Sequence, residues 1–447
     1  MALSGLEIYK LLPKTNCKEC GQPTCLAFAM KLAAKQADLS ACPYVSEQSK
    51  AALAAASAPP IRLITLGSGD KKVEVGNETV LFRHDKTFFH KPGIFVRLRD
   101  TLPTAEFEAA VGKIKDYSIE RVGITLRFDG IALENASGDA ATFATYAGTV
   151  ASKTDQPLVL MAANPAAMAA ALEKAGAAAP LVYAATPETA KEMATLAAKH
   201  KAALAVRADS LQALAELAEQ VKATGVEDIV LDPGARDLHA SLVALTQIRR
   251  LALKSNFRAL GYPTITFPGE GAESEQDETV RAAQHVAMYA GIIVLDHFDP
   301  ATAYALLTLR QNIYTDPQKP IQVSPGVYEI NAPKSESPLL VTTNFSLTYF
   351  SVAGEVEGSG KPAWLLIVDS EGMSVLTSWA AGKFDAEKIA KSVKQFDVPS
   401  KVGHKKIVIP GLVASLSGEL EEELPGWEIR VGPREAIDIP AYLKAWS

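Results

Sequence analysis

The amino-acid sequence predicts an α/β protein in three parts: a small cysteine-containing segment, a central (β/α)8 barrel and a smaller Rossmann-like domain. All four cysteines of the 447-residue chain lie between residues 17 and 42, which defines the first part. From residue 61 onward, short β-rich runs alternate with helical stretches, and a second set of such runs begins near residue 326. We expect the three parts to span residues 1–58, 59–325 and 326–447.

The composition excludes several classes of function. Hydrophobic residues make up 48% of the chain and charged residues 21%, which is ordinary for a globular protein. The formal net charge is −6 and there are no long basic runs, so neither nucleic acid nor an anionic membrane surface is an expected partner. No apolar run approaches the roughly 18–20 residues of a membrane span. The start, MALSGLEIYK, lacks the basic and apolar regions of a signal peptide, so we expect a cytoplasmic location.

The four cysteines follow the spacing C-x2-C-x4-C-x16-C, with thiols at Cys17, Cys20, Cys25 and Cys42. Four thiolates in one short stretch are enough to hold a metal site. Zinc usually takes two C-x2-C pairs, whereas a cubane iron–sulfur cluster accepts uneven spacing. The absence of cysteine from the rest of the chain argues against an oxidising compartment. The spacing favours an iron–sulfur cluster and leaves zinc and two disulfides as alternatives.

Apolar side chains around the cysteines can shield such a cluster from water. The stretch SGLEIYKLLP predicts a short helix with three inward side chains, Leu6, Ile8 and Leu11. A second helical run, CLAFAMKLAAK, offers Leu26, Phe28, Ala29 and Leu32. The following stretch, 48–60, reads as an alanine-rich helix broken by prolines, which is either a hinge or a helix packed on its neighbour.

Eight β-rich runs predict the strands of the barrel, and helix-like stretches such as NPAAMAAALEKAG separate them. The predicted strands are 62–69, 121–128, 157–163, 180–186, 203–209, 228–234, 258–267 and 291–297. A doubly wound open sheet is the alternative for this region.

Four further strands, together with helical stretches such as DAEKIAKSVKQF, predict a three-layer α/β domain at the C-terminus. They are 338–344, 363–369, 405–411 and 427–432. Ligands of open α/β sheets bind beyond the carboxyl ends of the strands. The four loops at those ends therefore provide candidate contacts, although ordinary turn chemistry is the favoured explanation when their composition is taken alone. Their residues include Thr342, Thr343, Asn344, Ser346, Ser370, Glu371, Gly372, Met373, Pro410, Gly411, Gly432, Pro433 and Arg434.

Polar residues after one barrel strand raise the possibility of catalysis there. The stretch LDPGARDLH places Asp232, Arg236 and Asp237 at a strand end, where the active sites of such barrels lie, and Arg249 and Arg250 follow. Asp-Pro-Gly is also a common turn, and Asp/Arg pairs often brace loops, so we favour a structural role.

The histidines provide no evident metal ligand. The pattern D-x-H-x-x-G is common where a histidine ligates the metal of a bound cofactor, and the nearest match, Asp237-Leu238-His239, lacks the glycine and lies in the barrel. We interpret His239 as a structural or surface residue. The other six histidines are isolated in the sequence.

The stretch GLEIYKLLPKTNCKECGQPTCLAFAMKLA resembles the N-terminus of the large (gamma) subunit of the corrinoid iron–sulfur protein of the acetyl-CoA (Wood–Ljungdahl) pathway, and of the related archaeal acetyl-CoA decarbonylase-synthase subunit. The resemblance continues through LDPGARDLH, TQIRRLA, TNFSLTYFSV, SEGMSVLT and VGPREA. It implies that the four cysteines hold a [4Fe–4S] cluster and that the C-terminal domain binds a cobamide. With the loop residues, the expected cobamide contacts are Leu340, Thr343, Asn344, Ser346, Ser370, Glu371, Gly372, Met373, Ser374, Thr377, Gly411, Gly432 and Pro433, with Thr377 near the lower face of cobalt.

The function that this resemblance implies is that of a methyl carrier. Cobalt in the Co(I) state would accept a methyl group from methyltetrahydrofolate through a methyltransferase and deliver it to acetyl-CoA synthase/CO dehydrogenase. The cluster would return Co(II) to Co(I), and the cobamide would be base-off and His-off. The implied partner is the small (delta) subunit, as a heterodimer. The alternatives are a corrinoid-free iron–sulfur electron-transfer subunit that serves a barrel enzyme, and a zinc-stabilised scaffold.

Overall fold

The structure, a computed structural model, describes residues 5–33, 36–50, 53, 59–121, 124–316 and 321–446. Contacts divide the chain into two compact units, Met1–Tyr117 with Arg127–Tyr314, and Ser118–Leu126 with Thr315–Ser447. The three-part boundaries expected from the sequence remain a prediction. The expected hinge within 48–60 lies largely outside the described residues. No helix in the described part of the chain is long and apolar enough to cross a bilayer.

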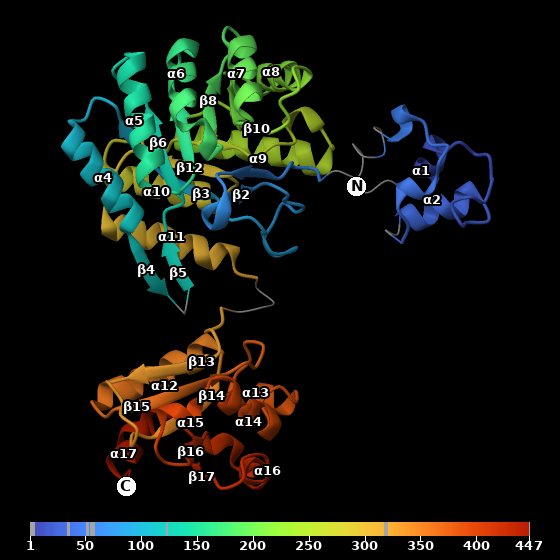
Figure 1. The fold of residues 1–447 in the computed structure, drawn as a ribbon. Helices are drawn as coiled ribbons and strands as arrows, with labels where there is room; N and C mark the ends of the chain where they lie inside the picture. The colour runs from blue at the N-terminus through green and yellow to red at the C-terminus, as the bar shows by residue number, and fades with distance from the viewer. Residues whose placement is uncertain are drawn as a thin grey trace. The chain divides into compact units, whose positions relative to one another are not determined.

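The N-terminal segment contains α1 (Gly5–Leu11), α2 (Cys25–Ala33) and the 3-10 turn η1 (Leu39–Ala41) (Figure 1). Its apolar core includes the predicted side chains of Ile8, Phe28 and Ala29. The prediction is wrong for Leu6 and Leu26, which are 59% and 38% exposed. Because residues three apart share one helix face, the buried side of α1 carries Gly5 and Ile8 and excludes Leu6.

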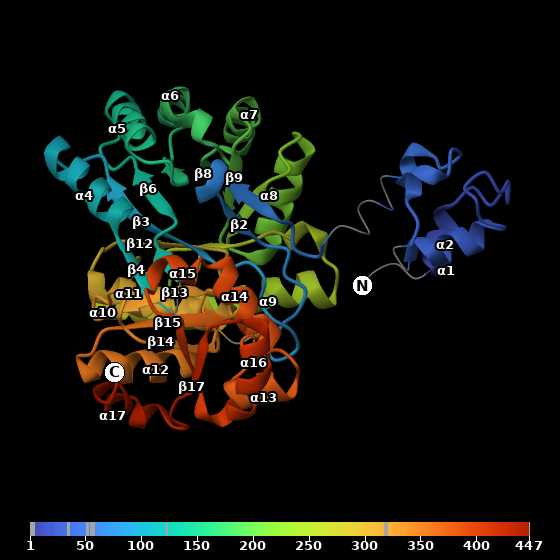
Figure 2. The same ribbon diagram turned by 60° about the horizontal axis from the view of Figure 1, so that its bottom comes forward.

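The central part is a parallel barrel with the strand order β10-β9-β8-β7-β6-β3-β12-β11 (Figures 1 and 2). A parallel bridge between Leu231 and Thr264 closes the ring. The strands are β3 (Gly93–Arg99), β6 (Gly130–Glu134), β7 (Leu158–Met161), β8 (Leu181–Ala185), β9 (Ala203–Arg207), β10 (Ile229–Asp232), β11 (Ile265–Thr266) and β12 (Ile292–Leu295). The surrounding elements are α4 (Thr104–Asp116), α5 (Ala140–Lys153), α6 (Pro165–Ala175), η3 (Gly176–Ala178), α7 (Ala190–His200), α8 (Leu211–Ala223), α9 (Leu238–Lys254), η4 (Arg258–Leu260), α10 (Glu275–Ala287) and α11 (Pro300–Tyr314).

Two of the eight predicted barrel strands are wrong. Residues 62–69 contain β1 (Ile64–Leu66), which pairs antiparallel with β2 (Val73–Val75) beyond the 3-10 turn η2 (Gly69–Lys71). The apolar side chains of β1 and β2 join the same core cluster as the barrel strands, so this hairpin covers the barrel interior. Its buried, β-branched composition therefore looks like that of a barrel strand in the sequence.

The second wrong strand, 121–128, overlaps a two-stranded sheet formed by β4 (Ser118–Arg121) and β5 (Ile124–Arg127). The barrel uses β3 and β6 in place of the two predicted strands. Strand β3 was missed because Arg97 and Arg99 interrupt its apolar run, although Arg97 is only 5% exposed and is paired with carboxylates.

The C-terminal unit contains a five-stranded sheet in the order β13-β15-β14-β16-β17 (Figure 2). Strands β14 (Leu339–Thr343), β15 (Ala363–Val368), β16 (Lys406–Ile409) and β17 (Glu428–Val431) are mutually parallel and agree with the four predicted strands. The additional edge strand β13 (Gly326–Ile330) runs antiparallel to β15. The other elements are α12 (Ser346–Ser359), α13 (Val375–Ala380), α14 (Ala386–Gln395), α15 (Val398–Lys401), η5 (Gly411–Leu416), α16 (Ser417–Glu423), η6 (Ala436–Asp438) and α17 (Ile439–Lys444).

Alternating residues of these strands pack on opposite faces of the sheet. Leu339 and Val341 belong to a cluster with α14 and α16, whereas Leu340 belongs to a cluster with α12 and α17. The same alternation holds along β15 and β16, as expected for strands that are buried on both faces. The sheet is therefore the middle layer of a three-layer domain.

Candidate functional site

The four cysteines come from three places in the N-terminal segment. Cys17 and Cys20 lie in the loop before α2, Cys25 is the first residue of α2, and Cys42 follows η1. The side chains of Cys20, Cys25 and Cys42 contribute to the apolar core of the segment, and Cys25 and Cys42 are buried. A group held by these thiols would be shielded on its protein side from water.

The loop before α2 has a backbone shape that suits a bound anionic cluster. Lys14, Asn16 and Lys18 have φ angles of 59°, 49° and 68°, and Gly21 has 73°. Repeated left-handed residues direct backbone N–H groups into a concavity, a geometry found at iron–sulfur sites. The Asn16 N–H donates to Cys25 Sγ at 3.4 Å, and the Cys25 N–H donates to Asn16 Oδ1 at 2.8 Å. Donors to sulfur are among the interactions that tune such clusters.

The same geometry bears on the two alternatives for the cysteines. All four are free thiols, so no disulfide is formed. Among the described residues, no three His, Cys, Asp or Glu side chains are grouped so as to hold one metal ion. A zinc site needs its four ligands to converge on a single atom, whereas a cubane spreads them over a larger body. The all-cysteine donor set and its uneven spacing in the sequence fit a cluster better than zinc.

Tyr44 also lies beside the cysteines, and sequence reasoning missed it. Its hydroxyl donates to Glu19 Oε1 at 2.7 Å. This hydrogen bond is the main reason that the pKa of Tyr44 is raised, and the negative charges of Cys17 and Cys42 contribute.

The C-terminal unit has a cavity of about 330 Å³ at the point where the strand order reverses. Strand β14 lies between β15 and β16, so the chain leaves β14 in one direction and later returns past it to reach β16. The described residues show one register pair between β14 and β16, Leu340 with Val408. Open α/β sheets bind ligands at such a topological switch point.

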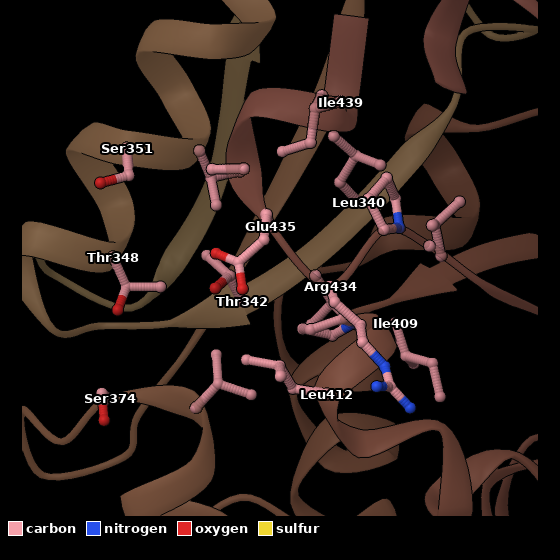
Figure 3. A pocket seen from close by; sticks show the side chains of 18 of the residues that line it. Leu340, Thr342, Thr348, Ser351, Ser374, Ile409, Leu412, Arg434, Glu435 and Ile439 are labelled. Carbon is pink, nitrogen blue, oxygen red and sulfur yellow. The ribbon is translucent and has the colours of Figure 1, made fainter. Parts of the chain in front are cut away.

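Apolar side chains form most of the cavity wall, and hydroxyl groups are set among them (Figure 3). Leu340, Val408 and Ile439 form part of the apolar surface. Thr348 and Ser351 come from α12 on one side, whereas Ser374 precedes α13 on another.

Three leucines of the cavity wall are unusually exposed. Leu347, Leu376 and Leu412 are 66%, 46% and 39% exposed. A group of exposed apolar side chains around a cavity marks a surface that a ligand or partner covers.

Thr342 of β14 also lines the cavity. Its side chain is 1% exposed, and its Oγ1 has no hydrogen-bond partner among the described residues. A buried polar group without a partner costs about 1–3 kcal/mol. A ligand that reached this hydroxyl would remove the cost.

Four of the predicted cobamide contacts line the cavity, namely Leu340, Ser374, Gly432 and Pro433. Nine do not: Thr343, Asn344, Ser346, Ser370, Glu371, Gly372, Met373, Thr377 and Gly411. Of these, Thr377 is exposed, and its hydroxyl lies 3.0 Å from that of Ser374.

Asn344 holds the loop after β15 in place. Its Oδ1 accepts hydrogen bonds from the Ser370 N–H at 3.0 Å, the Ser370 hydroxyl at 2.7 Å and the Gly372 N–H at 3.0 Å. Its amide group donates to Asp369 at 3.1 Å and to Gln322 at 3.2 Å. These polar groups satisfy one another, so they shape the loop that carries Ser374.

Gly411 and Gly432 bring the loops after β16 and β17 into close contact. The Gly411 N–H donates to Pro433 O at 2.9 Å, and the Gly432 N–H donates to Ile409 O at 2.9 Å. A Cβ on Gly411 would lie 2.5 Å from Gly432 O, which no side chain tolerates without a shift. Gly411 therefore positions the wall of the cavity and does not itself line it.

Thr348 and Ser351 were not among the predicted contacts. Both lie on α12 three residues apart, a spacing that places them on one helix face. The hydroxyl pair in the stretch SLTYFSV was the available signal, and the strand-end rule overlooked it because it considers only loops.

The carboxyl ends of the barrel strands carry a closed network of ion pairs. Asp232 accepts two hydrogen bonds from the Arg236 guanidinium, both at 2.9 Å, and one from the Tyr183 hydroxyl at 2.6 Å. Arg236 also pairs with Glu270. Glu270 in turn accepts a hydrogen bond from Arg97 at 2.9 Å, so Arg97 belongs to the same network. Burial lowers the pKa of Arg236, but the bond to Asp232 outweighs this effect and raises it. These groups neutralise one another, which supports the structural interpretation of Asp232 and Arg236.

The other polar residues singled out in the barrel do not join this network. Asp237 caps α9, accepting the Ala240 N–H at 2.9 Å. Arg249 is buried and donates to Val80 O, whereas Arg250 is exposed. His239 is exposed on α9, as the sequence indicated.

Among solved structures, the barrel resembles dihydropteroate synthase. The enzyme from Thermus thermophilus aligns over 56% of this chain and 100% of its own, with 18% identity and a TM-score of 0.39. The enzyme from Xanthomonas albilineans in complex with 7,8-dihydropteroate aligns over 57% and 100%, with 15% identity and a TM-score of 0.38.

Two family models match the sequence. The model "CO dehydrogenase/acetyl-CoA synthase delta subunit" matches residues 63–443, and the model "Putative Fe-S cluster" matches residues 12–44.

The delta-subunit model leaves out the cysteine segment. Full-length relatives that are named as large or gamma subunits cover that segment as well. The corrinoid/iron–sulfur protein large subunit of Moorella thermoacetica is 47% identical over 445 residues, which is 100% of this chain and 99% of the relative. The acetyl-CoA decarbonylase/synthase complex subunit gamma of Methanopyrus kandleri is 35% identical over 99% and 97%. The chain therefore belongs to the family of the corrinoid/iron–sulfur protein large subunit and the acetyl-CoA decarbonylase/synthase gamma subunit.

Proposed function

We propose that this chain is the cobamide-binding methyl carrier of the acetyl-CoA pathway. The observation that supports this most strongly is the cavity at the switch point of the C-terminal sheet, with its exposed leucines and its unpartnered Thr342 hydroxyl. When bound, a cobamide would supply the cobalt that carries the methyl group, and a [4Fe–4S] cluster would supply the electron that restores an oxidised cobalt.

The N-terminal segment is proposed to hold the cluster through Cys17, Cys20, Cys25 and Cys42. The burial of two of these thiols keeps water from the protein side, and the N–H of Asn16 stabilises negative charge on Cys25 Sγ.

The C-terminal unit is proposed to hold the cobamide over the carboxyl ends of β14 and β16. Leu347, Leu376 and Leu412 would lose their contact with water against an apolar part of the ligand. Ser374 and Thr377 lie side by side, Thr377 is exposed to solvent, and we propose that Thr377 faces the lower side of cobalt.

We propose that neither a histidine side chain nor the base of the cobamide itself coordinates the lower face of cobalt. None of the described residues that line the cavity is a histidine. A cobalt without a strong lower ligand is reduced more easily to the state that accepts a methyl group, so the base-off, His-off form suits the carrier role.

The proposed partners are the small (delta) subunit, a methyltetrahydrofolate methyltransferase and acetyl-CoA synthase/CO dehydrogenase. The names of the relatives, a large subunit and a complex subunit, motivate this assignment. Asp232 is paired with Arg236 and Tyr183 within the barrel, and this supports a structural role for the barrel in binding the other subunits.

Methyl transfer tests the proposal directly. The cobamide-loaded complex, reduced without oxygen, is given isotope-labelled methyltetrahydrofolate and the methyltransferase. We expect label to appear on the protein-bound cobamide and to disappear when acetyl-CoA synthase is added. A loaded complex that neither acquires nor releases label would contradict the carrier role, whereas electron transfer without cobamide would favour the corrinoid-free alternative.

A further inference from the structure

The wall of the switch-point cavity includes one buried polar atom that lacks a partner among the described residues. Thr342 Oγ1 is buried, has no hydrogen-bond partner among the described residues, and belongs to the cavity wall. The neighbouring hydroxyls of Thr348 and Ser351 lie on α12, whose side chains are more accessible (Figure 3). A ligand group that reaches Thr342 therefore meets a mostly apolar wall and one hydroxyl that is buried and unpartnered.

This surface suits one part of a cobamide better than the rest. The edge of the corrin ring carries several amide side chains, and each would need its own polar partner. The lower base is a flat aromatic ring with few polar atoms, which fits the apolar part of the wall that includes Leu340, Val352 and Val408. The chemistry of the wall thus favours the base as the group that enters.

The charge at the rim is compatible with the same orientation. Arg434 and Glu435 line the cavity, and their side chains turn in different directions in Figure 3. Arg434 is exposed and makes no hydrogen bond or ion pair within the described residues. A guanidinium is a good partner for the phosphodiester that joins the lower base to the ring system.

We infer that Thr342 determines which lower base the protein accepts, by donating a hydrogen bond to the ring nitrogen of the base. This inference rests on the proposed cobamide function. In a base-off cobamide that nitrogen no longer coordinates cobalt, so its lone pair needs a donor once it is buried. The Thr342 hydroxyl is a donor without an acceptor, and the two unsatisfied groups complement each other.

The test compares two cobamides that differ only in the lower base. One carries benzimidazole, which has the ring nitrogen, and the other carries a phenolic base, which lacks it. The dissociation constant of each is measured spectroscopically for the cobamide-free complex with its small subunit. The free benzimidazole cobamide must first release its base from cobalt, and this cost is the same for every protein variant. The quantity to compare between variants is therefore the ratio of the affinities for the benzimidazole and phenolic cobamides.

The Thr342→Val variant keeps the shape of the side chain and removes the donor. We expect the ratio of affinities, benzimidazole over phenolic, to fall about tenfold relative to the wild type, the amount that one hydrogen bond provides. The conservative variant Thr342→Ser keeps the hydroxyl and should hold the ratio within about twofold of the wild type. A general loosening of the cavity would weaken both cobamides together and would leave the ratio unchanged.

The outcomes separate this inference from the function on which it rests. An unchanged ratio in Thr342→Val, with both cobamides still bound, overturns the role of Thr342 and leaves the methyl-carrier proposal intact. Failure of the wild type to bind either cobamide overturns the proposed function itself. A ratio that falls equally in Thr342→Ser and Thr342→Val also contradicts the inference, because the hydroxyl is then not the determinant.

Discussion

Leu340 of β14 and Val408 of β16 form the register pair that joins the two halves of the C-terminal sheet. Both side chains belong to the wall of the switch-point cavity, so the place where the sheet reverses its strand order is also where a ligand can enter. The position of the cavity thus follows from topology, and its chemistry follows from the residues that surround this pair.

Filling the cavity should abolish cobamide binding without unfolding the protein. Ser351 is exposed and lines the cavity from α12. A tryptophan at this position should reduce the cobalt content about tenfold or more, because the indole occupies the space of the ligand. The matched control is Glu357→Trp, which places the same ring on the same helix away from the cavity. Equal cobalt content in the two variants would show that the ligand binds elsewhere.

Adding one methyl group at Gly411 should separate the loops after β16 and β17. The Cβ of Gly411→Ala would lie 2.5 Å from Gly432 O and 2.9 Å from Arg434 N. We expect the free energy of unfolding to fall by about 1–3 kcal/mol, measured by denaturant titration of the cofactor-free protein. The control is Gly418→Ala in α16, where a Cβ has no atom within 4 Å and should add about 0.5–1 kcal/mol. A change of the same sign in the free energy of unfolding of both variants would refute the close-contact argument.

Removal of the Asn16 side chain should weaken the cluster without removing a cysteine. Asn16→Gly keeps the left-handed backbone and the N–H donor but loses the oxygen that accepts the Cys25 N–H. We expect a chelator to bleach the cluster about fivefold faster under anaerobic conditions. Lys18→Gly relaxes the backbone in the same loop and removes no hydrogen bond of a cysteine, so its bleaching rate should match the wild type. Identical rates for Asn16→Gly and Lys18→Gly would contradict this role.

Acid should destabilise the barrel through His285. Burial, assisted by the charges of Arg281 and Arg236, lowers the pKa of this imidazole to about 4. Its Nε2 lies 3.1 Å from the Ser241 hydroxyl, and its Nδ1 has no partner among the described residues.

The folded state binds fewer protons at His285 than the unfolded state, whose pKa is near 6.5. The stabilisation is therefore complete above pH 6.5 and is lost as the pH falls toward about 4, by on the order of 3 kcal/mol. In His285→Leu, the free energy of unfolding should depend less steeply on pH across this window. Equal slopes for the two proteins would rule out His285 as the sensitive group.

The sequence was most informative where chemistry and periodicity agree. The cysteine segment and the four C-terminal strands were predicted because thiols are rare and buried parallel strands have apolar runs. The barrel strand β3 was missed because Arg97 and Arg99 lie within it, and their carboxylate partners come from distant parts of the chain.

The candidate cobamide contacts show a similar limit. Strand-end loops were identified, but the sequence cannot distinguish a residue that faces a ligand from one that holds the loop. Asn344 is fully engaged within the protein, whereas Thr342, two residues earlier, has its hydroxyl unpartnered. That difference depends on partners up to 28 residues away in the chain.

Metal analysis of the protein purified without oxygen tests the central claim most directly. The chain is produced with its small subunit in a host supplied with cobalamin, and iron, acid-labile sulfide and cobalt are measured. The account predicts about four irons and about one cobalt per chain, with the cobalt lost in Ser351→Trp and the iron retained. Iron without cobalt, even after cobamide is added, would contradict the methyl-carrier proposal and favour an electron-transfer subunit.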